Sequence, residues 1–215
     1  MPTRLSKRIP TPLPGVHFNG WHRKVYARGK HVLKVVHSHF TRTIAGKKIT
    51  LPMWLKSLRR YGVLDMNRAE AEHYQKYFSH VPNEMREYFA TVDRVRRVKK
   101  GSVLRMEAVR DFDGAMSKTL YETGHVNDLF FWQRFDGLVD YLIKNRIPFF
   151  DFSSLNFMVK RVSPYESIPV LVDYKSASTR PYALRIWLRV PSIREKRMRQ
   201  RYEAMKRKHV QSDDA

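Results

Sequence analysis

The sequence predicts a mixed α+β protein with two lobes: an N-terminal antiparallel sheet with a helix, and a reduced, mainly helical C-terminal lobe. Short β-branched runs separated by glycine turns dominate the first half, whereas the longest stretch of helical periodicity, 126–144, lies in the second. At 215 residues and 25.6 kDa, the chain is long enough for one compact two-lobed unit and too short for two large domains.

Two hairpins make up the predicted sheet. Residues 25–26 and 31–36 are short runs of β-branched and apolar side chains, and Gly29 lies in the turn between them. Residues 89–98 and 103–109 alternate in the same way around a second glycine turn.

Two helices are predicted between these hairpins. The basic segment 41–60 has apolar residues at helical spacing, namely Trp54, Leu55 and Leu58. Residues 67–78 form the second helix, with Asn67 as its N-cap and Glu70 three positions later, the arrangement of a capping box.

The second half is predicted to contain helix 126–144, then strands 157–162 and 168–172, with Asp173 at the end of the last strand. A final helix in the basic tail is expected to open with a capping box of Ser192 and Glu195. Its narrow apolar stripe is Met198, Tyr202 and Met205. This stripe has two interpretations, packing against the domain or contact of the helix with anionic headgroups at the inner membrane.

The formal net charge of +22 is concentrated at the two ends of the chain. Residues 1–64 contain 14 Lys and Arg and no acidic residue, 65–173 contain 16 of each sign, and 174–215 contain 12 basic and 4 acidic residues. This asymmetry indicates an anionic partner, for which nucleic acid, an anionic lipid surface and a phosphorylated metabolite all qualify.

The composition also excludes several classes of site. There is no cysteine, so disulfides, thiolate nucleophiles, CxxC zinc sites and iron–sulfur clusters are excluded. No stretch approaches the roughly 20 apolar residues of a membrane-spanning helix, and the proline-rich residues 1–15 lack the apolar run of a signal peptide. We therefore expect a cytoplasmic protein, with the inner-membrane surface as a peripheral location.

Several side chains occur in the order that phosphoryl transfer requires. Asp151 and Asn156 have the D-x-x-x-x-N spacing of a kinase catalytic loop, and Asp173 follows the next hairpin, where a metal-binding carboxylate belongs. Asp151 is expected to align or deprotonate the acceptor hydroxyl, and Asn156 and Asp173 are expected to hold Mg²⁺.

The first lobe supplies the residues expected to bind the nucleotide. Lys34 lies on a predicted strand after the glycine turn that contains Gly20 and Arg23, so ATP phosphates are expected to contact this segment. Glu72, or else Glu70, is the helix carboxylate expected to orient Lys34. The predicted cofactors are therefore ATP and Mg²⁺.

One motif resembles the metal-binding D-F-G of protein kinases but is predicted to have another role. Asp111-Phe112-Asp113-Gly114 precedes Asp151 and follows the strand 103–109, where the connection between lobes belongs. We interpret it as a turn with a free glycine.

The sequence resembles the YrbL family of PhoP regulatory network proteins over roughly residues 15–200. The resemblance is carried by 20–26, 111–114, Asn145-Arg146-Ile147 and the stretch from Asn156 to Asp173. It implies a small protein-kinase-like fold in a bacterial cytoplasm, in a family tied by regulation to the magnesium and envelope-stress response. Size, basicity and motif order are more remotely similar to the lipopolysaccharide core kinases, which phosphorylate sugars at the inner-membrane surface.

Departures from the kinase pattern narrow the expected substrate. Phe149 and Phe150 replace the His-Arg before the catalytic Asp, and Tyr174-Lys175 replace the Phe-Gly after the metal Asp. Only 42 residues follow Asp173, so a small or lipid-linked anionic acceptor is expected rather than a protein.

These motifs divide the chain into four predicted segments. They are a basic proline-rich arm (1–14), a nucleotide-binding part (15–110), a reduced lobe with the catalytic and metal loops (111–190), and a basic amphipathic helix with its tail (191–215). Two further hypotheses stay open: a kinase-like regulatory binding module without turnover, and a nucleic-acid binder. The last rests on charge alone and ranks lowest, because no recognition motif accompanies the charge.

Overall fold

The computed structural model describes residues 17–19, 23–36, 39–44, 47–61, 64–98, 101–175, 177 and 190–210. The chain divides into two compact units. The first comprises the described residues up to Ala71 together with Val92–Ala108, and the second comprises Glu72–Thr91 together with those from Val109 onward. The sequence places its lobe boundary near residue 110, whereas the units divide at 108/109 and also assign 72–91 to the second unit. Helix α2 (Met66–Tyr77) continues across the boundary between them.

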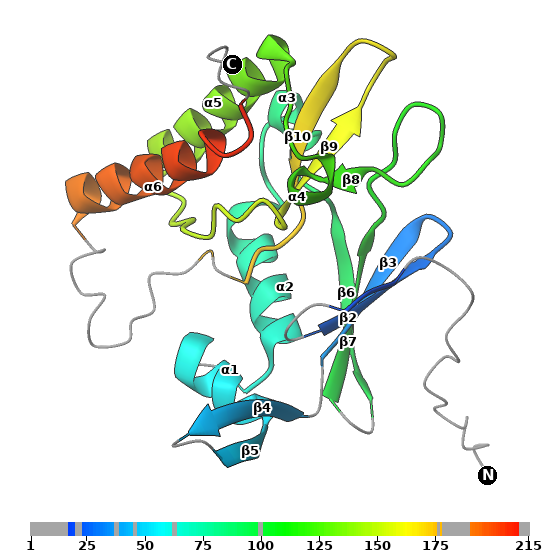
Figure 1. Cartoon of the computed structure of the whole chain (residues 1–215), viewed down its shortest axis with the longest axis vertical. Helices are drawn as coiled ribbons and strands as arrows, with labels where there is room; N and C mark the ends of the chain where they lie inside the picture. Colours follow the sequence, from blue (N-terminus) through cyan, green and yellow to red (C-terminus); the bar gives the residue numbers. More distant parts are fainter. Residues whose placement is uncertain are drawn as a thin grey trace. The chain divides into compact units, whose positions relative to one another are not determined.

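The first unit is built on a five-stranded antiparallel sheet in the order β1-β2-β3-β7-β6 (Figure 1). Its strands are β1 (His17–Asn19), β2 (Arg23–Arg28), β3 (His31–Val36), β6 (Val92–Val98) and β7 (Gly101–Glu107). Both predicted hairpins are confirmed as β2–β3 and β6–β7. Their pairing makes β3 the central strand, flanked on one side by Val25 of β2 and on the other by Leu104 of β7 at the level of Lys34.

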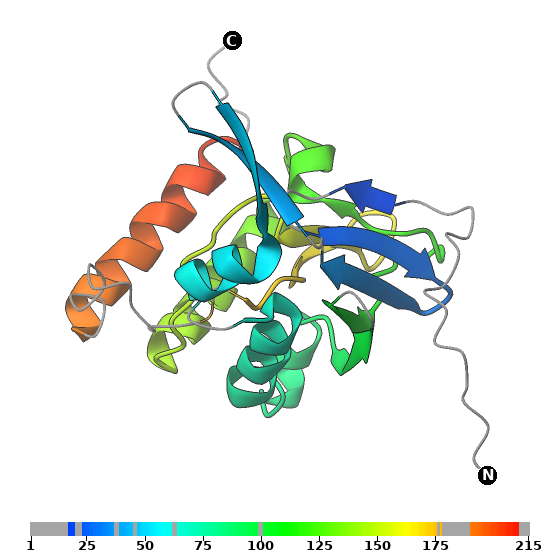
Figure 2. The same cartoon turned by 90° about the horizontal axis from the view of Figure 1, so that it is seen from below.

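A further hairpin in this unit was missed by the sequence patterns. Strands β4 (His39–Ile44) and β5 (Lys47–Pro52) pair with each other and lead directly into helix α1 (Met53–Tyr61), as Figure 2 shows. The predicted helix is confirmed, but the face it buries is different. Met53 and Ser57 are buried, whereas the apolar set Trp54, Leu55 and Leu58 is exposed.

Helix α2 begins at a different cap from the predicted one. The Asp65 carboxylate accepts hydrogen bonds from the backbone N–H groups of Asn67 (2.9 Å) and Arg68 (3.4 Å), which are the donors that the first turn leaves free. The prediction that Asn67 caps the helix and forms a capping box with Glu70 was therefore wrong. Both side chains are fully buried and make long-range contacts instead.

The second unit contains a three-stranded antiparallel sheet in the order β10-β9-β8, with four helices beside α2. The strands are β8 (Lys118–Thr119), β9 (Phe157–Arg161) and β10 (Ser167–Leu171), and the helices are α3 (Asn83–Arg86), α4 (Leu120–Thr123), α5 (Leu129–Lys144) and α6 (Pro191–Lys206). Helix α5 and strands β9 and β10 were predicted, whereas β8 and α4 are too short for a periodic signal. The α+β class with antiparallel sheets is thus confirmed.

Helices α5 and α6 lie side by side (Figures 1 and 2). Their contact includes the Phe135 and Tyr202 rings, whose centroids are 5.0 Å apart, and the Tyr202 hydroxyl donates to Asp136 at 2.5 Å. Met198, Tyr202 and Met205 are all buried. The apolar stripe of the tail helix therefore packs against its own unit, and most Arg and Lys side chains of α6 are exposed.

The predicted capping box of α6 was wrong. Val190 is the N-cap, it makes no side-chain cap bond, and Pro191 occupies the first turn. A proline at this position needs no hydrogen bond for its nitrogen and already has a helical φ angle, so it starts the helix without Ser192 acting as a cap.

Candidate functional site in two groups of residues

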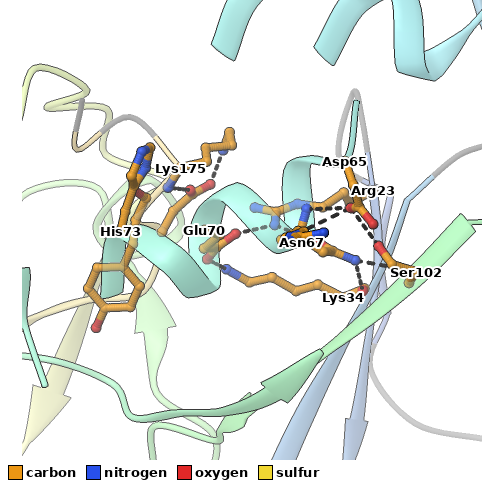
Figure 3. Close-up of polar contacts among 11 residues, drawn as sticks. Arg23, Lys34, Asp65, Asn67, Glu70, His73, Ser102 and Lys175 are labelled. Atoms are coloured by element: carbon orange, nitrogen blue, oxygen red, sulfur yellow. Dashed lines mark hydrogen bonds and ion pairs between the residues drawn. The ribbon is translucent and has the colours of Figure 1, made fainter. Parts of the chain in front are cut away.

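In the first unit, a buried carboxylate joins two cations from neighbouring strands. The Lys34 ammonium on β3 lies 2.7 Å from Oε1 of Glu70 on α2, and the Arg23 guanidinium on β2 is paired with Oε2 of the same carboxylate (Figure 3). All three residues are buried. A buried charge is tolerated when it is paired and hydrogen-bonded, so this cluster fixes each side chain in one orientation.

Asn67 ties the helix to the sheet beside this cluster. Its amide nitrogen donates to the carbonyls of Lys34 (2.9 Å) and Ser102 (3.0 Å), and its amide oxygen accepts from Arg23 at 3.1 Å. The Ser102 hydroxyl in turn donates to the Asp65 cap at 2.7 Å. The start of α2 is therefore held against β3 and β7 by side-chain bonds, which makes the Lys34–Glu70 pair part of a rigid scaffold (Figure 3).

The expected partner of Lys34 needs correction. Glu70 is the carboxylate that the structure places on Lys34, whereas Glu72 lies two positions further along α2 and is exposed. Two positions on a helix differ by about 200° in direction, so both cannot face one strand. Gly20 lies outside the described residues.

In the second unit, the predicted catalytic loop is closed by Asn156. Its side-chain amide donates to the main-chain carbonyl of Asp151 (3.0 Å), and its backbone N–H donates to the carbonyl of Ser153 (2.8 Å). Asn156 is buried, whereas Asp151 is half-buried. Residues 151–156 therefore form a closed loop in which Asp151 retains access to solvent.

Buried aromatic side chains anchor this loop. Phe149, Phe150 and Phe152 are all buried around Asp151, and the Phe149 and Phe152 rings lie edge to face with centroids 5.2 Å apart. The guanidinium of Arg201 on α6 donates to the Phe150 carbonyl. Aromatic packing thus anchors the loop, and Arg201 adds a polar contact to its backbone.

Asp173 is joined to the same loop through the backbone. The N–H of Val172 donates to the carbonyl of Asn156 at 2.9 Å, which places the residue after Val172 next to the loop. Hydrogen bonds therefore join the backbone segments that carry Asp151, Asn156 and Asp173 within one unit.

Lys175 is a charged partner of Asp173. Its ammonium is paired with Oδ2 of Asp173, and its backbone N–H donates to Oδ1 at 3.2 Å. The sequence showed Lys175 only as a departure from a motif. The ion pair itself was not predicted, because an i,i+2 contact forms only in a particular turn geometry.

The donor atoms suit a magnesium ion in part. An amide oxygen of Asn156 and the Asp173 carboxylate are hard oxygen ligands, which Mg²⁺ prefers, and Mg²⁺ commonly takes its remaining ligands from water and substrate phosphates. Within the described part of the chain, no group of three or more His, Cys, Asp or Glu side chains could hold a metal ion.

The Asp111–Gly114 segment is the turn predicted for it. The N–H of Gly114 donates to the Asp111 carbonyl (2.9 Å), and Gly114 has a φ of 83°, a conformation that glycine adopts without strain. The carboxylates of Asp111 and Asp113 both pair with Arg161. The pKa of Asp113 is lowered, first by the hydrogen bond that its carboxylate accepts from the Ala115 N–H and then by Arg161. This segment is therefore a structural turn between β7 and β8.

Comparison with known proteins identifies the family. The family model described as PhoP regulatory network protein YrbL matches residues 18–210, a range that includes both groups of residues described above. No curated protein matches the chain. Among the described residues, no helix is long and apolar enough to cross a membrane. The match covers most of the chain, and the protein therefore belongs to the YrbL family of PhoP regulatory network proteins.

Proposed function

We propose that this YrbL-family protein has a protein-kinase-like fold and acts as an ATP- and Mg²⁺-dependent phosphotransferase. The acceptor in this proposal is a small or lipid-linked anionic molecule, with a sugar of the lipopolysaccharide core type as the leading example. The observation that carries the proposal is the hydrogen-bonded loop in which Asn156 holds the Asp151 carbonyl and accepts from the residue before Asp173.

Each residue has a role that its local geometry supports. Asp151 is the half-exposed carboxylate that accepts the proton of the acceptor hydroxyl, while the acceptor oxygen bonds to the γ-phosphorus and the bond to the β,γ-bridging oxygen breaks. Lys34, oriented by Glu70, binds nucleotide phosphates, and Arg23 supports the same carboxylate. Asn156 and Asp173 would hold a Mg²⁺ ion, which when bound would neutralise the negative charge of the phosphates.

The charge distribution supports an anionic acceptor. The described residues of α6 leave Arg and Lys side chains exposed, and the first 64 residues of the chain carry no acidic side chain. Such a field raises the local concentration of anionic substrates and favours peripheral contact with anionic headgroups at the cytoplasmic face of the inner membrane.

A second candidate is a kinase-like module that binds nucleotide and signals without turnover. The observation that favours it is the pairing of Lys175 with Asp173, because an ammonium already neutralises the carboxylate that catalysis would require for the metal. In this case the carboxylate of Asp151 would not be needed for the function of the protein in the cell.

Nucleotide binding is tested first by the thermal shift that ATP produces in the full-length protein, with and without Mg²⁺. We expect a shift that is larger with Mg²⁺, since a ligand that binds only the folded state stabilises it. No shift under either condition contradicts both candidates.

Asp151→Asn separates transfer from binding. The phosphotransferase proposal expects normal ATP binding and loss of phosphate transfer in this variant, and Asp140→Asn, at an exposed carboxylate on α5, is the matched control. If Asp151→Asn has no effect in cells while Asp173→Asn abolishes function, the binding module is favoured.

A further inference from the structure

The pair formed by Asp173 and Lys175 uses both oxygens of the carboxylate. Oδ2 is paired with the Lys175 ammonium and Oδ1 accepts from the Lys175 N–H, so one residue engages both atoms. The side chains are only 10% and 12% exposed. A pair shielded to this degree is screened little by salt or water, so its attraction is stronger than that of a surface ion pair.

The residue between them is firmly anchored. Tyr174 is fully buried, and its hydroxyl donates to the Ala90 carbonyl at 2.7 Å and lies 2.9 Å from the Leu171 carbonyl. The centroids of the Tyr174 and Phe78 rings are 4.8 Å apart, and the main-chain carbonyl of Tyr174 lies 3.1 Å from Nδ1 of His73.

This anchoring fixes the backbone on both sides of Tyr174. The Asp173 carboxylate and the Lys175 ammonium are therefore held near each other before any ligand arrives, and little conformational entropy is lost when they pair. The pair is thus a built feature of the second unit and not a chance contact between two flexible surface side chains.

We propose that Lys175 is a resident cation that competes with the divalent metal for Asp173. This inference rests on the proposed function in taking Asp173 as the metal carboxylate. Free Mg²⁺ must displace the ammonium and therefore binds weakly, whereas a metal that arrives with a nucleotide brings phosphate oxygens that accept the released Lys175. Lys175 thus makes metal binding at Asp173 depend on the nucleotide.

The test is the affinity of the protein for Mn²⁺ without nucleotide, followed by the electron paramagnetic resonance of the free ion. We expect Lys175→Met to bind Mn²⁺ on the order of tenfold more tightly than the wild type, because a neighbouring positive charge is lost. Lys144→Met removes an equal charge at an exposed site on α5 and should bind like the wild type. The gain should disappear in Lys175→Met/Asp173→Asn.

Equal Mn²⁺ affinity in the wild type and Lys175→Met overturns the inference. Should Lys175→Met fail to fold, Lys175→Gln retains a hydrogen-bond donor for Asp173 without the charge, and the same comparison applies to it. The test also separates the two proposals. Tighter Mn²⁺ binding without any ATP-induced thermal shift supports the competition between Lys175 and the metal, but it removes both the nucleotide dependence and the proposed function. ATP binding with unchanged Mn²⁺ affinity removes this inference alone.

Discussion

The ammonium of Lys34 lies 2.7 Å from Oε1 of Glu70, although the two residues are 36 positions apart in the chain. Arg23 is paired with the other oxygen of the same carboxylate, and all three side chains are buried. One carboxylate therefore connects two adjacent strands of the sheet to helix α2. The same pair orients the amine to which we assign nucleotide phosphates, so its loss should affect both stability and binding.

Glu70→Gln should lower the free energy of unfolding by about 3 kcal/mol or more, because two buried cations would face a neutral amide. Glu72→Gln, at an exposed position on the same helix, should change it by about 0.5 kcal/mol or less. Urea unfolding of both variants measures the difference. Equal effects in the two variants would show that Glu70 does not hold the cluster.

We assign Asn156 a structural role and a proposed metal-binding role, which different substitutions separate. Asn156→Ala removes the donor to the Asp151 carbonyl and the oxygen assigned to the metal, so we expect a loss of about 1–3 kcal/mol in stability and of the Mg²⁺-dependent part of the ATP thermal shift. Asn156→Asp also loses the donor but retains an oxygen ligand, and should keep that part of the shift. A full Mg²⁺ effect in Asn156→Ala would exclude Asn156 as a ligand.

Neutralising Asp173 and neutralising Asp113 should have different effects on ATP binding. Asp173→Asn is expected to remove the Mg²⁺ dependence of ATP binding, since it removes the carboxylate that we propose holds the metal. Asp113→Asn should leave binding unchanged, because this side chain belongs to the turn paired with Arg161. Calorimetric titration with ATP measures both, and loss of binding in Asp113→Asn alone would reverse the assignment.

The stabilisation that Tyr202 contributes to the folded state should be lost at alkaline pH. Burial, together with the hydrogen bond to Asp136, raises the pKa of Tyr202 above its ordinary value of 10.0. The unfolded chain therefore loses this proton at a pH where the folded chain retains it. The stabilisation is complete below pH 10 and decreases as the pH rises further.

The control for this effect is Tyr202→Phe. At pH 7 it should cost about 1.5–3 kcal/mol, the usual value for a hydrogen bond to a charged group. Above about pH 10 the difference in unfolding free energy between the wild type and Tyr202→Phe should narrow, which denaturant unfolding across this range measures. A difference that stays constant with pH would contradict the assigned cause.

Much of the fold was predictable because its elements carry local signals. Helix α5 presents Phe131, Phe135 and Leu138 on one buried face, and the hairpins alternate around glycine turns. Caps were predicted less well. Asn67 has the right residue type and spacing for an N-cap, but its side-chain amide donates hydrogen bonds to the main-chain carbonyls of Lys34 and Ser102 in the sheet. Such long-range contacts leave no periodic pattern in the sequence.

The site was predictable where spacing along the chain carries the information. The spacing between Asp151 and Asn156 is that of a kinase catalytic loop, and in the structure the Asn156 side chain closes this segment onto the Asp151 carbonyl. The choice between Glu70 and Glu72 depends on the rotation of α2 against β3, which one sequence does not specify. The pairing of Lys175 with Asp173 depends on the anchored turn at Tyr174, for which the sequence offers no signal either.

The central claim is that one nucleotide contacts Lys34 and that its metal is held by Asn156 and Asp173. A crystal structure of the protein with a non-hydrolysable ATP analogue and Mg²⁺ tests it most directly. The account predicts phosphate oxygens on the Lys34 ammonium, Mg²⁺ on the Asp173 carboxylate, and Lys175 released from Asp173 to a phosphate. A nucleotide bound away from both Lys34 and Asp173 would contradict it.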